Sequence, residues 1–498
     1  MHRILLFAVF VVATCGLIYE LVCGTVASYL LGDSVFQFST IIGAYLFSMG
    51  IGSWLSRYFK LNLLTWFIQI ELLVGLVGGF TPICLFILFS TTSSFQLFLY
   101  LFVGLTGTLV GLEIPLLLRI LKDRIEFSDL ISKVFTVDYI GALFASIVFP
   151  MFLVPFLGLI RTALFFGMLN TAVGIYICYT LSEKIEWIKY LRTQGWTILL
   201  VLLSAFVFST RIETFTETLA FQEPVIFSKS SPYQRIVITR QKDQLKLYLN
   251  GNLQFNSSDE YRYHEALVHP AMACAENPEN ILVLGGGDGL ALREIYRYPS
   301  VKNVVLVDLD SVVTNLFKFN PMLTELNKNA LMDVRTKIIN EDAFQWIKEQ
   351  NDQLFDVIIV DFPDPTAFSL GKLYSDRFYK ELSRVLKRSG NLVVQSTSPF
   401  VAPNSFWCVN NTLNSSGFKT LPYHAFVPSF GDWGYVLAGF EQPRRNLPII
   451  LNLKFLSLSG FQAMCVFPND IAFRKTDINR LNNQKLVKYF EEEWAKIN

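Results

Sequence analysis

The amino-acid sequence predicts two halves of different fold class: an N-terminal all-α transmembrane bundle, and a C-terminal α/β Rossmann-like domain preceded by a small antiparallel β-sheet. Three observations predict this arrangement. Long apolar stretches fill the first 210 residues. Residues 223–254 alternate between apolar and polar side chains, as half-buried strands do. Residues 281–310 run in the order strand, glycine-rich turn, helix, strand and acid, which is typical of the nucleotide-binding half of a doubly wound sheet.

Length and composition set the domain organisation. At 498 residues the chain has room for two or three domains. We expect a transmembrane helical domain at 1–210, a small β-sheet at 222–258, the Rossmann-like domain at 259–440 and a C-terminal extension at 441–498. The net charge of +1 argues against a nucleic-acid partner. The seven cysteines include no C-x-x-C pair and no metal-ligand spacing, so we expect reduced cysteines and no metal site.

Several apolar segments of the first half are long enough to span a bilayer. They lie near residues 4–23, 38–59, 63–89, 95–118, 134–157 and 160–180. A further apolar segment, residues 196–208, has only 13 residues. We expect that segment to be interfacial or re-entrant rather than to span. The sequence therefore predicts a multi-pass protein of the cell (inner) membrane, in contact with lipid.

Basic residues in the short loops predict the orientation, because Lys and Arg favour the cytoplasmic side. One set of alternate loops carries Arg57, Lys60, Arg119, Lys122, Arg124, Lys133, Lys184, Lys189 and Arg192, and the other set carries only Arg161. The N-terminus is then cytoplasmic. Six spans keep the C-terminal half in the cytoplasm, whereas a seventh puts it outside. We expect six, because the chemistry argued below requires a cytosolic metabolite.

Four acids lie within the apolar segments: Glu20, Glu71, Glu113 and Asp138. Carboxylates inside a membrane are energetically costly and are candidates for function. One interpretation is a site or path for a cation such as an amine. The other is hydrogen bonding between helices, or helix ends near the interface. The sequence leaves both open.

The second half begins with short alternating segments. Strands are expected at 225–227, 235–239 and 245–249, followed by an Asn250-Gly251 turn. The run Ser257-Ser-Asp-Glu260 has the pattern of a capping box, which predicts a helix at 261–275. His264 and His269 lie five residues apart on this helix, a spacing that does not place them on one face for a shared metal.

The glycine-rich turn Gly285–Gly289 contains Asp288. Glycines at such a turn let the backbone approach a ligand closely. A dinucleotide site would present backbone N–H groups to a pyrophosphate there, and a carboxylate would repel that anion. Asp288 therefore favours a ligand that is neutral or cationic at this point.

Five carboxylates follow the predicted parallel strands. They are Asp288, Asp308, Asp342, Asp361 and Asp364. Ligands of open parallel sheets bind beyond the C-terminal ends of the strands, so we expect these acids to face one crevice. Such a crevice favours a cation, such as an amine or a sulfonium. An amine nucleophile must lose a proton before it attacks, and Asp361 or Asp364 can accept that proton.

These residues resemble the polyamine aminopropyltransferases, the spermidine synthase family. The motifs that carry the resemblance are Tyr233-Gln234, Gly251-x-x-Gln254, Asp259-Glu-x-x-Tyr263-His264-Glu265, Gly285-Gly-Gly-Asp288-Gly289, Val307-Asp308-Leu-Asp310, Glu341-Asp342-Ala343, Asp361-x-x-Asp364-Pro365 and Gln395. The first half resembles the membrane-spanning extension of one bacterial branch, at Gly16–Glu20, Gly111–Pro115 and Asp138–Ala142. The fold implied for the second half is Rossmann-like, of the methyltransferase type.

The resemblance implies transfer of an aminopropyl group from decarboxylated S-adenosylmethionine to putrescine, which gives spermidine and methylthioadenosine. It implies no permanently bound cofactor. Asp361 is implied as the general base, with Gln254, Tyr263 and Asp364 holding the amine. The residues implied to bind the co-substrate are Gln234, His264, Asp288, Asp308, Asp342 and Ala343. Asp288 agrees with this, because it would repel the carboxylate of intact S-adenosylmethionine.

Two departures from the family pattern bear on the acceptor. The Gly-Pro expected after Pro365 is absent, and Val427 stands where soluble members carry a tyrosine that contacts substrate. Trp433 and Tyr435 are candidates to compensate. Alternatives are an aminopropyltransferase for another amine, a methyltransferase, and a membrane transporter or sensor that binds polyamine without turnover. A homo-oligomer is compatible with the sequence but is not predicted by it.

Overall fold

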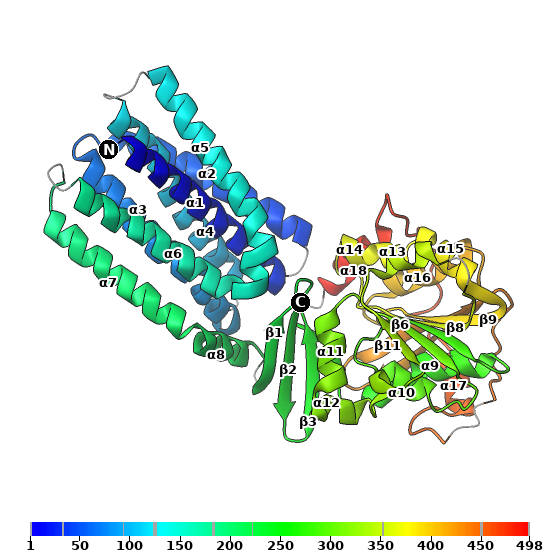
Figure 1. The fold of residues 1–498 in the computed structure, drawn as a ribbon. Coiled ribbons are helices and arrows are strands. Elements are labelled where there is room, and N and C mark those ends of the chain that lie inside the picture. The colour runs from blue at the N-terminus through cyan, green and yellow to red at the C-terminus, as the bar shows by residue number, and fades with distance from the viewer. Residues whose placement is uncertain are drawn as a thin grey trace. The chain divides into compact units, whose positions relative to one another are not determined.

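The computed structural model describes residues 2–31, 34–92, 94–122, 127–181, 185–221, 223–350, 353–448 and 452–496. Two compact units divide the chain, Met1–Pro232 and Tyr233–Asn498. The first unit is helical and the second is built around a β-sheet (Figure 1). The first half is therefore helical and the second is an α/β unit, as predicted.

Seven long helices make up most of the first unit where it is described. They are α1 (His2–Leu31), α2 (Ser34–Leu55), α3 (Leu63–Thr91), α4 (Phe95–Leu121), α5 (Phe127–Val148), α6 (Val154–Thr180) and α7 (Ile188–Val207), and the shorter α8 (Ser209–Phe221) follows. Within the described residues, six stretches are long and apolar enough to cross a membrane. One of them, Asp129–Thr180, has 52 residues. It contains both α5 and α6, joined by the π-helical turn Phe149–Leu153 and a break at Gly158, where φ is 73°.

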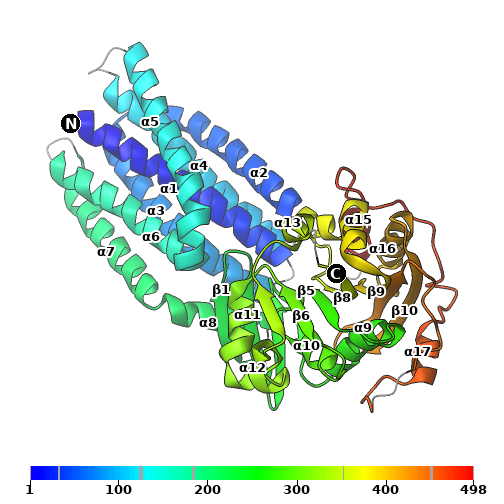
Figure 2. The ribbon, with the colours of Figure 1, turned by 45° about the vertical axis from the view of Figure 1, so that its right-hand side comes forward.

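The structure corrects the length expected for the last apolar segment of this half. Residues 196–207 belong to α7, which has 20 residues and begins at Ile188. The first turns of α7 carry polar and basic side chains, so the apolar run in the sequence covers only the later part of the helix. A helix of 20 residues spans about 30 Å, the thickness of the hydrocarbon core. In Figures 1 and 2, α7 runs alongside α6.

Close backbone contacts hold α2 and α4 together. A Cβ atom on Gly52 would lie 2.0 Å from the carbonyl oxygen of Thr108, and one on Gly111 would lie 2.2 Å from that of Met49. Only glycine fits at such a distance. Small residues at helix crossings are the usual device where lipid supplies no hydrophobic driving force between helices.

Strands begin just before the boundary between the units. After β1 (Val225–Ser230), the strands β2 (Arg235–Gln241), β3 (Gln244–Leu249) and β4 (Asn252–Asn256) pair in antiparallel order. The turn between β3 and β4 contains Asn250 and Gly251, both with positive φ. This turn matches the expected Asn-Gly hairpin.

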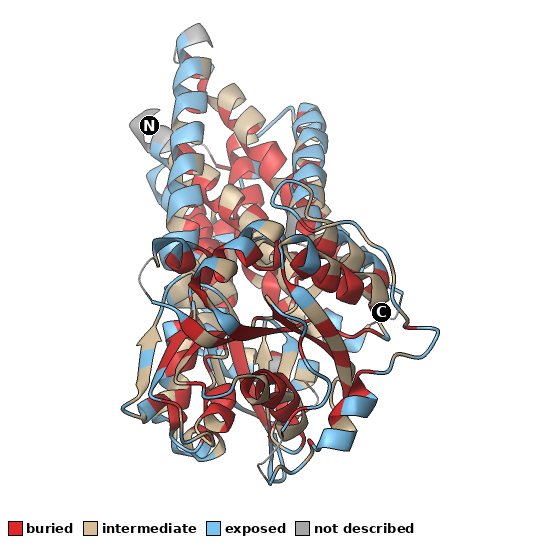
Figure 3. Ribbon diagram, turned by 90° about the vertical axis from the view of Figure 1, so that its right-hand side faces the viewer, coloured by how far each residue is buried: buried red, intermediate tan, exposed pale blue. Residues whose placement is uncertain are grey.

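The main sheet of the second unit has the strand order β10-β11-β9-β8-β5-β6-β7. Its strands are β5 (Asn280–Gly285), β6 (Asn303–Val307), β7 (Thr336–Ile339), β8 (Phe355–Asp361), β9 (Leu386–Gln395), β10 (Lys419–Val427) and β11 (Gly431–Gly439). Strands β5 to β9 pair in parallel, and β11 and β10 extend the sheet in antiparallel order. The central strands are apolar and buried (Figure 3), which confirms the Rossmann-like fold.

Helices flank this sheet. They are α9 (Glu260–Cys274), α10 (Leu290–Ile295), α11 (Ser311–Phe319), α12 (Pro321–Leu326), α13 (Ala343–Glu349), α14 (Phe368–Gly371), α15 (Asp376–Val385), α16 (Pro403–Ser415), α17 (Leu458–Met464) and α18 (Lys485–Trp494). After β5 the chain adds β6 and β7 on one side, and then returns to place β8 on the other side of β5. A crevice for ligands opens at such a reversal, beyond the C-terminal ends of the strands.

Carboxylates attach the C-terminal segment to this fold. Glu265 of α9 accepts hydrogen bonds from the backbone N–H groups of Lys454, Phe455 and Leu456 at 2.7–2.9 Å. Glu493 of α18 accepts from the N–H groups of residues 404 and 405, at the first turn of α16. Charged acceptors at a helix N-terminus stabilise it.

Candidate active site

The glycine-rich turn after β5 lies against the ends of two neighbouring strands. Gly285 has φ 79°, in the left-handed region that favours glycine. A Cβ atom on Gly285 would lie 2.1 Å from the carbonyl oxygen of Asp361, and one on Gly287 would lie 2.7 Å from the carboxylate of Asp308. The turn therefore needs glycine, and it brings the ends of β6 and β8 to one crevice.

Asp308 follows β6, and its carboxylate is held by backbone donors. The N–H groups of Gly287 and Asp310 donate to it at 3.1 and 2.9 Å. Burial raises the pKa of Asp308 to about 6. The amide of Gln234 donates to Asp310 at 2.9 Å rather than to Asp308. Gln234 and Asp308, both predicted to bind the co-substrate, are thus brought to the same corner through Asp310.

Asp361 ends β8, in register with Gly285 on β5. The Tyr263 hydroxyl donates a hydrogen bond of 2.6 Å to one carboxylate oxygen of Asp361. Burial raises the pKa of Asp361 to about 6, although the charge of His264 and the bond from Tyr263 oppose the rise. A carboxyl group with a pKa near neutral pH is suited to act as a general base.

His264 is a buried cation beside these acids. Its Nδ1 atom lies 2.8 Å from Oε2 of Glu260, and Arg293 contacts both oxygens of Glu260 at 2.8 and 2.9 Å. Burial disfavours the charged imidazole, but the hydrogen bond and charge of Glu260 outweigh it and raise the pKa of His264 to about 9. Protonated His264 offsets part of the negative charge of Asp288 and Asp361. The crevice therefore contains a buried cation as well as the predicted acids.

Asp364 lies on the loop after β8 and is oriented by a residue of unusual backbone conformation. The Thr397 hydroxyl donates to Oδ2 of Asp364 at 3.1 Å. Thr397 has φ 56°, a region that β-branched residues rarely adopt. Burial raises the pKa of Asp364 to about 7. Its Oδ1 atom is buried without a hydrogen-bond partner among the described residues, so one acceptor is available to a ligand.

Asp342 already has a cationic partner. The Lys372 ammonium lies 2.5 Å from Oδ2 of Asp342. The other oxygen accepts from the N–H of Phe344 at 2.8 Å and caps α13, whose first residue is the buried Ala343. Lys372 therefore supplies a positive charge to one of the five acids, so not all of them depend on a ligand for a cationic partner. The sequence offered no signal for this pair, because the partners are thirty residues apart.

Two further predicted residues make local contacts. Oδ1 of Asp288 accepts from the N–H of Leu290, the first residue of α10, at 2.9 Å, and burial raises the pKa of Asp288. The Gln254 amide donates to the carbonyl oxygen of Asn252 at 3.2 Å. No hydrogen bond joins Gln254 to another predicted site residue in the part of the chain that the structure describes.

Aromatic side chains line the region next to Asp361. The Tyr263 ring lies 5.6 Å from that of Tyr435 and 6.1 Å from that of Phe430, measured between centroids. The Trp433 indole lies 5.2 Å from Phe430 and donates to Gln395 at 3.2 Å. Trp433 and Tyr435, the candidates to replace the missing tyrosine, share one face of β11 because they are two residues apart. The sequence did not indicate Phe430.

The position of that missing tyrosine is Val427, which is fully buried at the end of β10. It pairs with Gly431 across the turn to β11. Tyr435, beside Tyr263, and Trp433, beside Phe430, are the aromatic side chains that β11 contributes to this region. The crevice thus combines oriented carboxylates, one of them beside a buried imidazolium, with an aromatic wall that suits a methylene chain.

Comparisons with known proteins show what the chain is similar to. Residues 260–447 match a family model described as the spermine/spermidine synthase domain. The chain is 48% identical over 497 residues to a polyamine aminopropyltransferase of Leptospira interrogans, covering 100% of both chains. It is 50% identical over 505 residues to polyamine aminopropyltransferase 2 of Ralstonia nicotianae, covering 100% of this chain and 99% of the relative. A crystal structure of spermidine synthase from Thermotoga maritima covers 55% of this chain and 88% of its own, with TM-score 0.45 and 25% identity.

Proposed function

Since the chain belongs to the polyamine aminopropyltransferases of the spermine/spermidine synthase family, we propose that it transfers an aminopropyl group from decarboxylated S-adenosylmethionine to putrescine. The products are spermidine and methylthioadenosine. The chain is accordingly an enzyme, a transferase. The observation that carries the proposal for this particular reaction is the half-buried Asp361, which ends β8 beside the glycine turn and accepts a hydrogen bond from Tyr263.

Asp361 is the proposed general base. The acceptor reaches the site as an ammonium ion, which transfers a proton to Asp361 and becomes a nucleophile. Its nitrogen then attacks the methylene carbon bonded to the sulfonium, and a C–N bond forms as the C–S bond breaks. The electron pair of the C–S bond stays on sulfur, which leaves as a neutral thioether. Because the pKa of the Asp361 carboxyl group is about 6, the group can accept and release that proton near neutral pH.

The donor is proposed to lie along the glycine turn. Asp308 follows β6, where ribose hydroxyls are held in sheets of this kind, and Gln234 reaches the same corner through Asp310. Asp288 lies next, beside protonated His264. Asp342 and Ala343 begin α13 close to this edge of the sheet and are proposed to contact the adenosyl group.

The acceptor is proposed to lie between Asp361 and Asp364. The unpartnered oxygen of Asp364 would receive its distal ammonium, and the aromatic side chains Tyr263 and Trp433 would pack on its methylenes. Gln254 remains a proposed contact of the amine, although it requires rotation from its bond to Asn252. Putrescine carries an ammonium group at each end of its methylene chain, one for each of these two acids.

An acceptor panel tests the proposal. Purified enzyme is incubated with decarboxylated S-adenosylmethionine and, in turn, putrescine, cadaverine, agmatine and spermidine, and products are identified by mass. Spermidine formed from putrescine at the highest kcat/KM is expected. Preference for another amine would reassign the acceptor, and a methylated product from intact S-adenosylmethionine would reject the reaction. Binding of polyamine without any turnover would favour a sensor or transporter.

Substitution of the proposed general base tests the mechanism. Asp361→Asn keeps the shape but cannot accept a proton, so kcat should fall about 10²- to 10⁴-fold, the usual contribution of a general base. Asp470→Asn is the matched control, because Asp470 is exposed and lies outside the site. Unchanged product formation by the Asp361 variant would show that another group takes the proton.

The protein is proposed to reside in the cell (inner) membrane through its apolar helices, with the catalytic half facing the cytoplasm, where decarboxylated S-adenosylmethionine is made. The apolar helices α1 to α7 support the membrane assignment. The side is supported only by the supply of substrate. A homo-oligomer remains a proposal without structural support.

A further inference from the structure

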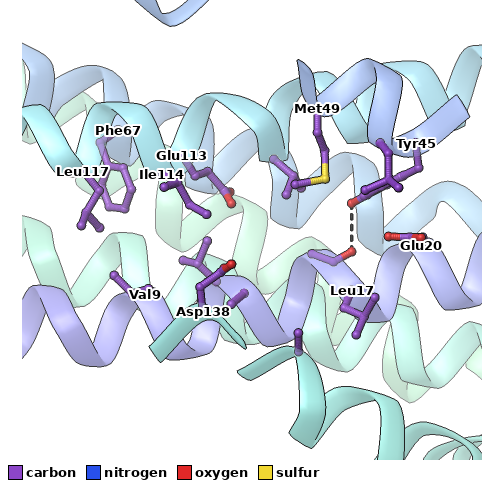
Figure 4. A pocket seen from close by; sticks show the side chains of 16 residues that line it. Val9, Leu17, Glu20, Tyr45, Met49, Phe67, Glu113, Ile114, Leu117 and Asp138 are labelled. Atoms are coloured by element: carbon purple, nitrogen blue, oxygen red, sulfur yellow. Dashed lines mark hydrogen bonds between the residues drawn. The ribbon is translucent and has the colours of Figure 1, made fainter. Parts of the chain in front are cut away.

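The helical unit contains a cavity lined in part by acids. The cavity measures about 140 Å³ and lies among α1, α2, α4 and α5 (Figure 4). Roughly 10–15 Å³ suffices for one water molecule, so the cavity has room for a ligand of several heavy atoms. Most of its wall is apolar, and its carboxylates come from Glu20, Glu113 and Asp138.

Glu113 is the most unusual of these acids. Its side chain is 1% exposed, and neither carboxylate oxygen has a hydrogen-bond partner among the described residues. In Figure 4, Glu113 on α4 and Asp138 on α5 point toward one another across the cavity. A buried carboxyl group without a partner is strongly unfavourable, because nothing replaces the water it has lost. A ligand with hydrogen-bond donors and positive charge would satisfy it.

More unpartnered polar groups occupy the interior of the same unit. Glu71 on α3 is fully buried and both of its oxygens lack a partner among the described residues. The Tyr19 hydroxyl and the Asn170 side-chain amide share this property. Hydrogen bonding between helices was one of the two interpretations that the sequence left open for the acids. For Glu71 and Glu113, the described residues supply no such bond.

The spacing of the acids favours an organic cation over a metal ion. A metal ion needs several ligands within about 2.6 Å. In the described residues, no group of three His, Cys, Asp or Glu side chains is placed to hold one. An ammonium group brings three donors and a charge, and the methylenes attached to it would pack on the apolar wall of the cavity.

We propose that the helical unit binds a linear organic amine in this cavity, with one ammonium group between Glu113 and Asp138 and the chain directed along α1 toward Glu20. This amine site is separate from the catalytic crevice, because every residue that lines it belongs to the first unit. The inference goes beyond the transferase reaction and does not require it.

Equilibrium binding tests the amine site. Full-length protein in lipid nanodiscs is dialysed against radiolabelled spermidine, and separately putrescine, without the aminopropyl donor so that no turnover occurs. The double variant Glu113→Gln, Asp138→Asn should bind one equivalent of amine fewer than the wild type. Glu186→Gln is the matched control, because Glu186 is an exposed acid of the same unit. It should bind as the wild type does.

Transferase activity of the double variant should equal that of the wild type, and its helical content, measured by circular dichroism in the nanodiscs, serves as the folding control for the first unit. Equal amine binding by the double variant and the wild type would overturn the proposal. Displacement of the amine from the wild type by an equal concentration of sodium would overturn the assignment to an organic cation. Either failure leaves the transferase assay unchanged, so it is distinguishable from a failure of the proposed reaction.

Discussion

At the scale of single residues, the bond between Tyr263 and Asp361 sets a pH dependence. The carboxyl group must be ionised to accept a proton, and its pKa is about 6. Activity should therefore fall below pH 6, up to tenfold per pH unit. The Tyr263 hydroxyl lowers this pKa. Tyr263→Phe should move the acid limb of the kcat/KM profile to higher pH.

The comparison needs a neighbouring tyrosine as control. Tyr261→Phe alters the same helix without touching Asp361, and should leave the acid limb in place. Ionisation of the substrates is common to all three proteins and cancels in the comparison. An acid limb that does not move in the Tyr263 variant would mean that Asp361 does not determine it.

The ion pair between Lys372 and Asp342 makes a second residue-scale prediction. Lys372→Met removes the charge that neutralises Asp342. If Asp342 binds the adenosyl group, the freed carboxylate should lose its fixed position, and KM for the donor should rise about tenfold while kcat changes little. Steady-state kinetics with the donor varied measure this. Lys380→Met, on the exposed face of α15, is the control. A fall in kcat alone would contradict a role in donor binding.

At the scale of elements, Glu493 joins α18 to the first turn of α16 by hydrogen bonds. Its carboxylate accepts from two N–H groups and from the hydroxyl of Ser405, and it is buried. Hydrogen bonds to a charged group contribute about 1.5–3 kcal/mol each. Glu493→Gln should lower the midpoint of thermal unfolding, whereas Glu492→Gln, which is exposed, should not. Equal midpoints would show that the charge of Glu493 adds nothing to stability.

The same scale shows which parts of the structure a sequence can predict. The order of strand, glycine turn, helix and strand depends on local residue types, so β5, β6 and the positions of Asp308 and Asp361 followed from it. Contacts between residues far apart in the chain could not be predicted from the sequence. Residues 257–260 have the pattern of a capping box, yet the Asp259 carboxylate accepts from the N–H and hydroxyl of Ser429 instead of capping α9.

The full length of α7 and the cations of the site were not predicted from the sequence, for related reasons. A window that seeks apolar residues misses a helix whose first turns are polar but packed against α6. The charge of His264 depends on Glu260 and Arg293, and the charge of Asp342 depends on Lys372. Glu260 lies one helical turn before His264, but Arg293 and Lys372 reach their acids only in the folded chain, so counting acids alone overstated the negative charge of the crevice.

For the whole molecule, the number of helices that cross the membrane decides on which side of it each end of the helical unit lies. The seven helices α1 to α7 put the N-terminus and Glu223 on opposite sides if all of them cross. The basic loops around Arg57 and Arg119 favour a cytoplasmic N-terminus. The proposed reaction uses a donor from the cytoplasm, so we expect the catalytic half on the cytoplasmic side. These two expectations are compatible only if one helix does not cross.

Reporter fusions resolve the conflict. Green fluorescent protein and alkaline phosphatase are fused in turn after Lys60 and after Glu223, since the first fluoresces only inside and the second is active only outside. We expect a cytoplasmic signal at Glu223. An external signal there would overturn the cytoplasmic assignment of the catalytic half. Signals on opposite sides at the two positions would establish an odd number of crossings between Lys60 and Glu223.

The left-handed backbone of Thr397 has a consequence for engineering the enzyme. A β-branched residue in that conformation forfeits on the order of 1–3 kcal/mol of folding free energy. Thr397→Gly should release that strain and raise the unfolding temperature, while the lost hydroxyl leaves Asp364 without its donor. A screen for thermostable variants would select this substitution and discard activity with it. Stability and turnover therefore trade against one another at this position, and a useful library would hold it fixed.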